Sequence, residues 1–249
     1  MGSPTPNRRT RRRKSQDKYT PPPDVETITL AKILDGCRTV LPEQQPRLGA
    51  EDGLNLKLWV AGDRSLVRQP CVSVVGTRDV SAQGAARARR LGRELAAAGV
   101  VVVSGLARGV DTEALNSAIQ VGGKVIAVIG TPIDRAYPAE NKRLQEKIYR
   151  DHLLVSQFPP SSRVFPSNFP ERNKVMAALS DGTAIVEAGE SSGTLHQAAE
   201  CLRLGRWLFI AQSAAKNPVL HWPTKFIGLP RVRVLTSTED ILEALRVHL

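Results

Sequence analysis

The sequence repeats one unit several times: a short run of β-branched residues, a glycine-containing turn and the start of a helix. Three turns of this kind stand at residues 75–78, 104–111 and 190–195. Such units build a parallel sheet and bring the turns to one edge of it, where exposed N–H groups and helix N-termini hold phosphate. Arginines stand inside two of the turns, at Arg78 and Arg108. We therefore expect a phosphate-bearing ligand, either a nucleotide or a polynucleotide.

Strand and helix alternate over most of the chain. The runs that favour strands are residues 71–75, 100–104, 125–129, 153–156, 183–187, 207–211 and 232–235. The segments that favour helices are residues 82–98, 111–121, 139–150, 170–179, 194–204 and 239–247. This order predicts an α/β fold with a doubly wound, mostly parallel sheet and helices on both faces.

The beginning of the chain differs from the rest in charge. Residues 1–20 carry seven Lys or Arg and one acid, in a chain of 249 residues with a net charge of +11. We expect residues 1–23 to be a disordered basic tail, which attracts polyanions by releasing counterions. Residues 24–55 are expected to form a short helical extension, with its helix at residues 25–41, and a linker. Residues 56–249 are expected to form the main domain.

The cysteines and histidines indicate neither a disulfide framework nor a metal site. Cys37, Cys71 and Cys201 lie far apart, and the four histidines have no ligand spacing. No apolar run is long enough to cross a bilayer. We therefore expect a cytoplasmic protein that uses no metal, no other cofactor and no membrane.

The segment at residues 168–174 combines an aromatic ring, cations and amides at the start of a helix. Arginine clamps phosphate oxygens in a planar fork, lysine supplies a point charge, and a phenyl face stacks an unpaired base. Arg172, Lys174 and Phe169 could fill these roles in turn. The alternative for Phe169 is a packing role, as a staple against its own helix.

Five motifs resemble the DNA-processing protein A (DprA/Smf) family in order and spacing: residues 72–78, 104–111, 137–141, 168–174 and 192–195. The resemblance extends from about residue 58 to residue 211. It implies a Rossmann-like domain that binds single-stranded DNA in a basic pocket. It also implies a homodimer that delivers the strand to a RecA-type recombinase during natural transformation of competent cells, and it implies no catalysis.

The resemblance further implies roles for single residues. Arg78 would grip phosphate beside the Gly76 turn, Arg172 and Lys174 would line the pocket, and Phe169 would meet a base. Backbone amides would come from Ser104, Gly105 and Gly193. The whole expected set of DNA- and phosphate-binding residues is Gly76, Thr77, Arg78, Ser104, Gly105, Arg108, Gly109, Asn168, Phe169, Arg172, Asn173, Lys174, Ser192, Gly193 and Thr194.

The sequence departs from the family pattern at both ends. Members commonly add an N-terminal helical domain and a C-terminal winged helix, whereas here we expect only a short helix before the sheet, and the sequence ends at Leu249. After Ala211, residues 212–218 replace the glycine-rich stretch of the family. A specialised paralogue from a mobile element or a defence locus fits these departures as well as a transformation protein does.

Two other functions stay open. Residues 192–195 also resemble LOG-type phosphoribohydrolases, which split nucleoside 5′-monophosphates. However, Gln197 stands where that family has a glutamate, so the carboxylates left for such an enzyme are Glu187 and Glu200. The third possibility is a sensor that binds a small nucleotide in the same crevice without turnover.

Overall fold

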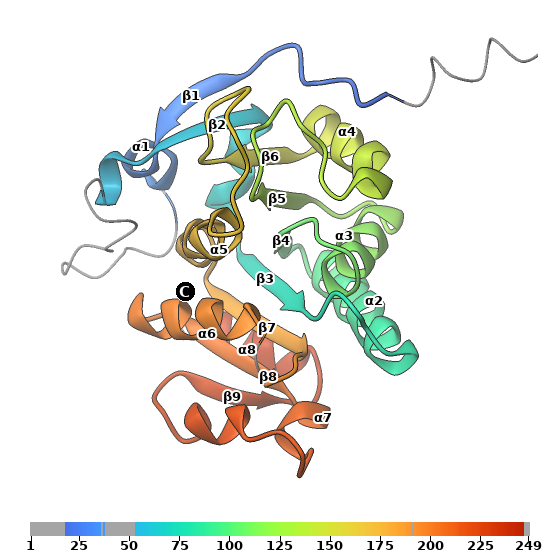
Figure 1. Cartoon of the computed structure of the whole chain (residues 1–249). Helices are drawn as coiled ribbons and strands as arrows, with labels where there is room; N and C mark the ends of the chain where they lie inside the picture. Colours follow the sequence, from blue (N-terminus) through green and yellow to red (C-terminus); the bar gives the residue numbers. More distant parts are fainter. Residues whose placement is uncertain (1–17, 36, 38–52, 191, 247–249) are drawn as a thin grey trace, which may run out of the picture.

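The computed structural model describes residues 18–35, 37, 53–190 and 192–246. Its centre is a nine-stranded sheet with the strand order β1-β2-β6-β5-β4-β3-β7-β8-β9 (Figure 1). The strands from β6 to β9 in this order pair in parallel, while β1 and β2 run antiparallel at one edge. The predicted fold class, a mostly parallel α/β sheet, is confirmed.

The parallel strands fall where the sequence predicts them, to within one residue at each end. They are β3 (Cys71–Gly76), β4 (Val101–Ser104), β5 (Val125–Ile129), β6 (Leu153–Ser156), β7 (Gly182–Glu187), β8 (Trp207–Ala211) and β9 (Val232–Leu235). Successive side chains enter two separate hydrophobic cores, with Val101 and Val103 in one and Val102 in the other. This alternation means that both faces of the sheet are covered.

Helices cover the two faces as two groups. One core packs α2 (Ala82–Ala97), α3 (Val110–Gln120), α4 (Lys142–Asp151) and α8 (Glu239–Arg246) against the sheet, and the other packs α1 (Leu30–Leu34), α5 (Asn168–Ala178) and α6 (Thr194–Arg203). The remaining short elements are α7 (Gln212–Ala215) and the 3-10 turns η1 (Gly53–Asn55), η2 (Arg64–Arg68), η3 (Ala139–Asn141) and η4 (Trp222–Lys225).

The N-terminal segment corrects the prediction of a helix over residues 25–41. Its first part is a strand, β1 (Glu26–Thr29), and α1 is a helix of five residues only. Residues 38–52 lie outside the described residues. The β-branched run at residues 27–29 pairs with the open edge of β2 (Lys57–Gly62), with Ile28 opposite Leu58. Edge pairing satisfies backbone groups that a short isolated helix would hold only weakly, so the extension belongs to the main sheet.

The expectation of a disordered tail over residues 1–23 is wrong for its last part. The Tyr19 hydroxyl donates to the carbonyl of Ile133 at 3.0 Å and accepts from Gln145 at 2.9 Å. The Thr20 N–H donates to the Glu146 carboxylate on α4 at 2.8 Å. These bonds fix residues 19 and 20 on the domain, whereas residues 1–17 lie outside the described residues.

The order of the strands determines where a ligand can enter. From β3 the chain moves outward through β4, β5 and β6, and it then returns to place β7 on the other side of β3. α2, which follows β3, lies on one face, and α5, which precedes β7, lies on the other. Crossovers that diverge in this way leave a crevice outside the carboxyl ends of the two strands.

Candidate nucleic-acid interface

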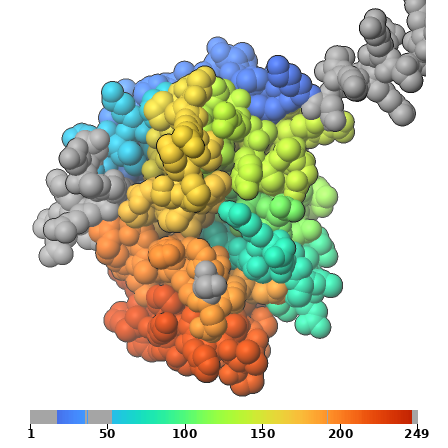
Figure 2. All heavy atoms as spheres, viewed as in Figure 1, coloured from blue at the N-terminus to red at the C-terminus, as the bar shows by residue number. Residues whose placement is uncertain are grey.

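A cleft of about 380 Å³ lies at this change of strand order. Its walls come from the turns after β3, β4 and β7, from α5 and from the start of α6. In Figure 2 the teal segment after β3, the gold segment of α5 and the orange segment after β7 meet at one surface. Nine of the expected site residues line the cleft: Gly76, Thr77, Arg78, Phe169, Arg172, Asn173, Ser192, Gly193 and Thr194.

A smaller hollow adjoins the cleft and shares Arg78, Phe169 and Arg172 with it. Gly105 and Arg108 line this hollow, so the turn after β4 joins the same surface. The turns that the sequence predicts to converge therefore lie together, although more than 100 residues separate the first from the last.

Arg78 and Phe169 form a cation–aromatic pair where the cleft and the smaller hollow meet. The Arg78 guanidinium lies 5.3 Å from the centre of the Phe169 ring, and the Tyr137 ring lies 5.5 Å from the same centre. Arg78 is exposed and Phe169 is half-buried. A ring between a cation and a second ring can stack a base while the cation contacts the neighbouring phosphate.

Arg172 is buried beneath this pair and serves the architecture of the site. Its Nη1 donates to the carbonyls of Gly105 and Val128, each at 2.5 Å. Burial lowers the pKa of Arg172 to about 10, which leaves the guanidinium charged at neutral pH. A Cβ on Gly105 would lie 2.1 Å from that Nη1, so the close packing requires glycine at position 105.

Asp111 occupies the Gly105 amide, which the family resemblance assigns to the ligand. Its Oδ2 accepts from the N–H groups of Gly105 at 3.0 Å and Ala107 at 3.3 Å. The carboxyl is buried, and burial raises its pKa while the charge of Arg172 opposes that rise. The Gly105 amide is therefore engaged within the protein, and it holds the turn after β4 in shape.

Four expected residues line neither the cleft nor the smaller hollow: Ser104, Gly109, Asn168 and Lys174. The buried Ser104 hydroxyl donates to the carbonyl of Val74 at 2.7 Å. Gly109 has a φ of +74° and lies against the backbone of residues 77 and 78, where a side chain would collide. The Lys174 ammonium pairs with Glu171 on its own helix at 2.9 Å. These residues shape or flank the site without facing it.

The structure adds contributors that sequence reasoning missed. Gln197 lines the cleft, and its buried Oε1 has no hydrogen-bond partner among the described residues. Tyr137 and Gly130 line the hollow, where the Phe169 ring packs against Gly130. The signal for Gly130 was available, because this glycine also follows a buried strand directly.

Two features are absent from residues 18–35, 37, 53–190 and 192–246, the described part of the chain. No group of His, Cys, Asp or Glu side chains suitable for a metal ion occurs in them. Among those same residues, no helix has the length and apolar character needed to span a bilayer.

Fold and site together define a Rossmann-like domain with an arginine- and aromatic-lined cleft at its topological switch point. A family model described as DNA recombination-mediator protein A matches residues 42–246. The chain belongs to this family, DprA/Smf.

A similar protein and its structure agree with this membership. DNA processing protein DprA of Streptococcus pneumoniae is 42% identical over 185 residues, which are 74% of this chain and 65% of the relative. The chain thus spans just under two thirds of that relative's length. The X-ray structure of DprA from Streptococcus pneumoniae superposes with a TM-score of 0.74 at 31% identity, covering 89% of this chain and 74% of that one.

A more distant structure shows the same fold. DNA processing protein A from Helicobacter pylori, described for its single-stranded DNA binding mode, superposes with a TM-score of 0.71 at 23% identity. The match covers 90% of this chain and 96% of that one.

Proposed function

We propose that this protein binds single-stranded DNA along the cleft and the adjoining hollow, with little sequence preference. The observation that carries the proposal is the exposed Arg78 lying over Phe169 where turns from three strands meet. Membership of the DprA/Smf family supports it, as does the single-stranded DNA binding described for the Helicobacter pylori protein.

Different residues would contact the phosphates and the bases of a bound DNA strand. Arg78 supplies a charged contact to phosphate, and the α6 N-terminus at Thr194 adds the positive end of a helix dipole. Phe169 and Tyr137 offer ring faces, which accept any base because every base has a π-face. Arg172 adds buried charge and holds the turn after β4 in place. These contacts are to the phosphate backbone and to the faces of the bases, which predicts weak sequence preference.

The cellular role follows from the family. We propose that the protein protects single-stranded DNA as a homodimer and delivers it to a RecA-type recombinase, in natural transformation or in another recombination process. Light scattering during gel filtration tests the homodimer. Acceleration of RecA filament formation on protein-coated single strands tests delivery, and unchanged filament kinetics would remove that part of the proposal.

Fluorescence anisotropy with a labelled oligothymidylate tests binding. Wild-type protein is expected to bind, and Arg78→Ala or Phe169→Ala is expected to weaken binding about tenfold or more. Lys174→Ala is expected to have a smaller effect, because that ammonium already pairs with Glu171 and does not line the cleft.

The chain offers a matched control for the arginine variant. The Arg163 guanidinium also lies 5.3 Å from the centre of a phenyl ring, that of Phe165, but neither residue lines the cleft. Arg163→Ala removes the same charge and the same cation–aromatic contact at another place. Equal losses in Arg163→Ala and Arg78→Ala would show that binding depends on net charge and not on this cleft.

The geometry favours DNA binding over the alternative function, a LOG-type phosphoribohydrolase activity. Neither Glu187 nor Glu200 lines the cleft. Glu187 accepts from the Ser81 hydroxyl at 2.6 Å, and Glu200 pairs with Arg203. Chromatography of nucleoside 5′-monophosphates incubated with the protein tests the alternative, and release of free base that disappears in Glu187→Gln or Glu200→Gln would restore it.

A further inference from the structure

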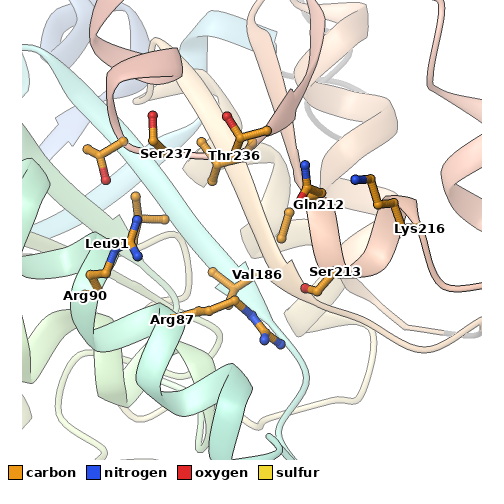
Figure 3. Close-up of a pocket in the computed structure, with 12 residues that line it drawn as sticks. Arg87, Arg90, Leu91, Val186, Gln212, Ser213, Lys216, Thr236 and Ser237 are labelled. Carbon is orange, nitrogen blue, oxygen red and sulfur yellow. The ribbon is translucent and has the colours of Figure 1, made fainter.

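A second cavity, of about 320 Å³, lies at the carboxyl ends of β7, β8 and β9 (Figure 3). It lies between α2 and the segments that follow β8 and β9, and its floor includes Val186, whose side chain belongs to the core on the α2 face. The cleft described above is lined instead by α5, which packs on the opposite face. The two cavities are therefore separate sites, and none of the functions considered so far uses this one.

The cavity is cationic. Arg87, Arg90 and Lys216 line it, and no carboxylate does so within the described part of the chain. Figure 3 shows Lys216 extending inward from the side opposite the two arginines. Arg87 is held by Glu187 at 3.2 Å and Arg90 by Glu94 at 3.1 Å.

Several polar groups of the cavity have no partner among the residues that the structure describes. The exposed Lys216 ammonium and the hydroxyls of Ser213 and Ser237 make no intramolecular hydrogen bond among the described residues. Donors left open around a concave surface are the groups that an anion such as phosphate accepts from.

Part of the cavity wall is apolar. Leu91 of α2, Val186 of β7 and Leu235 of β9 contribute side chains to it. A cavity of this volume is much larger than inorganic phosphate, and small-molecule sites combine an apolar wall with a few placed polar groups. Cations and aliphatic side chains in one cavity together suit a ligand that has a phosphate at one end and a flat ring at the other.

We propose that this cavity is a second binding site, specific for a nucleoside phosphate. The phosphate is bound by Lys216, Arg87 and the hydroxyl of Ser213, and the base packs against Leu91 and Leu235. The proposal does not depend on DNA binding in the cleft, because it shares no lining residue with that site.

Isothermal titration of the full chain with AMP, with adenosine and with inorganic phosphate tests the site. AMP is expected to bind more tightly than either of its parts, because only AMP engages the cations and the apolar floor together. Lys216→Glu is expected to weaken AMP binding about tenfold or more, since it replaces a positively charged donor by a carboxylate that repels the phosphate. Ser213→Phe, which fills the cavity, is expected to abolish it.

Two controls separate this site from the cleft. Lys225→Glu makes the same charge change on an exposed lysine outside the cavity and is expected to leave AMP binding unchanged. Arg78→Ala is expected to weaken oligonucleotide binding while AMP binding persists. AMP binding that is lost in Arg78→Ala and retained in Lys216→Glu would overturn the proposal and assign the nucleotide to the cleft. Absence of AMP binding by the wild-type protein, or binding no tighter than that of phosphate, would also overturn it.

Discussion

At the scale of single residues, the site depends on a buried cation and on the glycines that make room for its neighbours. Arg172 spans from α5 to carbonyls of the turn after β4 and of β5, and Asp111 holds the same turn from the side of α3. Both residues thereby fix the shape of the proposed DNA site from within the protein. Variants at Arg172 should therefore be interpreted as changes in the shape of the site as well as in its charge.

Gly105→Ala tests this close packing. The new methyl group would lie 2.1 Å from Arg172 Nη1, so the free energy of unfolding is expected to fall by about 2 kcal/mol. Urea denaturation measures the change. Gly189→Ala is the matched control, because Gly189 also lines the cleft but has nothing within 4 Å of its added Cβ. Equal stability of the two variants would contradict the packing argument.

His152 makes stability depend on pH. Burial, with a smaller effect of Lys124, lowers the pKa of His152 from 6.5 to about 4. The unfolded chain therefore binds a proton between these values when the folded protein does not, so stability is full above about pH 6.5 and falls as the pH decreases towards 4. Thermal melting of wild type and His152→Gln at pH 4.5 and 7 measures the effect.

The wild type is expected to lose about 1 to 2 kcal/mol more than His152→Gln over that interval. His196→Gln, at an exposed histidine, is the control for replacing a histidine by glutamine. Parallel pH profiles for wild type and His152→Gln would exclude His152 as the source.

At the scale of elements, the N-terminal segment is joined to the domain at two places. β1 pairs with β2, and the Tyr19 hydroxyl accepts a hydrogen bond from Gln145 of α4. The Tyr19 hydroxyl reaches the loop at residues 130–138, which also contributes Gly130 and Tyr137 to the hollow beside the cleft. Residues 18–20 are thus attached next to the loop that borders the proposed DNA path.

Tyr19→Phe tests this attachment. It removes the hydrogen bonds to Ile133 and Gln145, and the expected cost is about 1 kcal/mol in the free energy of unfolding, measured with urea. Tyr137→Phe is the control, because Tyr137 is an exposed tyrosine that contributes its ring to the hollow. A smaller loss in Tyr19→Phe than in Tyr137→Phe would argue against the attachment.

At the scale of the whole molecule, the net charge of +11 is divided between the folded domain and the first residues of the chain. Binding of single-stranded DNA should weaken steeply with salt, by about 0.7 in the logarithmic slope for each phosphate contact. Deletion of residues 1–17 removes six cations and one acid, so it should reduce this slope.

The same deletion separates the tail from the cleft. Oligonucleotide titrations at several salt concentrations, with and without residues 1–17, should show that Arg78→Ala weakens binding in both forms. If the deletion alone removes all binding, the cleft is not the DNA site and the tail is.

The sequence by itself determined the repeated unit of the fold, because β-branched runs and glycine turns leave few alternatives for the seven parallel strands. It also located the turns around Gly76, Gly105 and Gly193, since the edge of a parallel sheet gathers them regardless of their distance in sequence. It failed at residues 26–29, where a short run becomes a strand only because the edge of β2 is open beside it.

Only the tertiary structure decided what each polar group at the site does. Asp111 takes the Gly105 amide, Arg172 turns inward to two carbonyls, and Lys174 pairs with Glu171. The cationic cavity between α2 and Lys216 joins segments more than 100 residues apart and has no motif of its own. Local patterns fix backbone conformation, whereas the partner of a charged side chain depends on which distant segment the folded chain brings within a few ångströms.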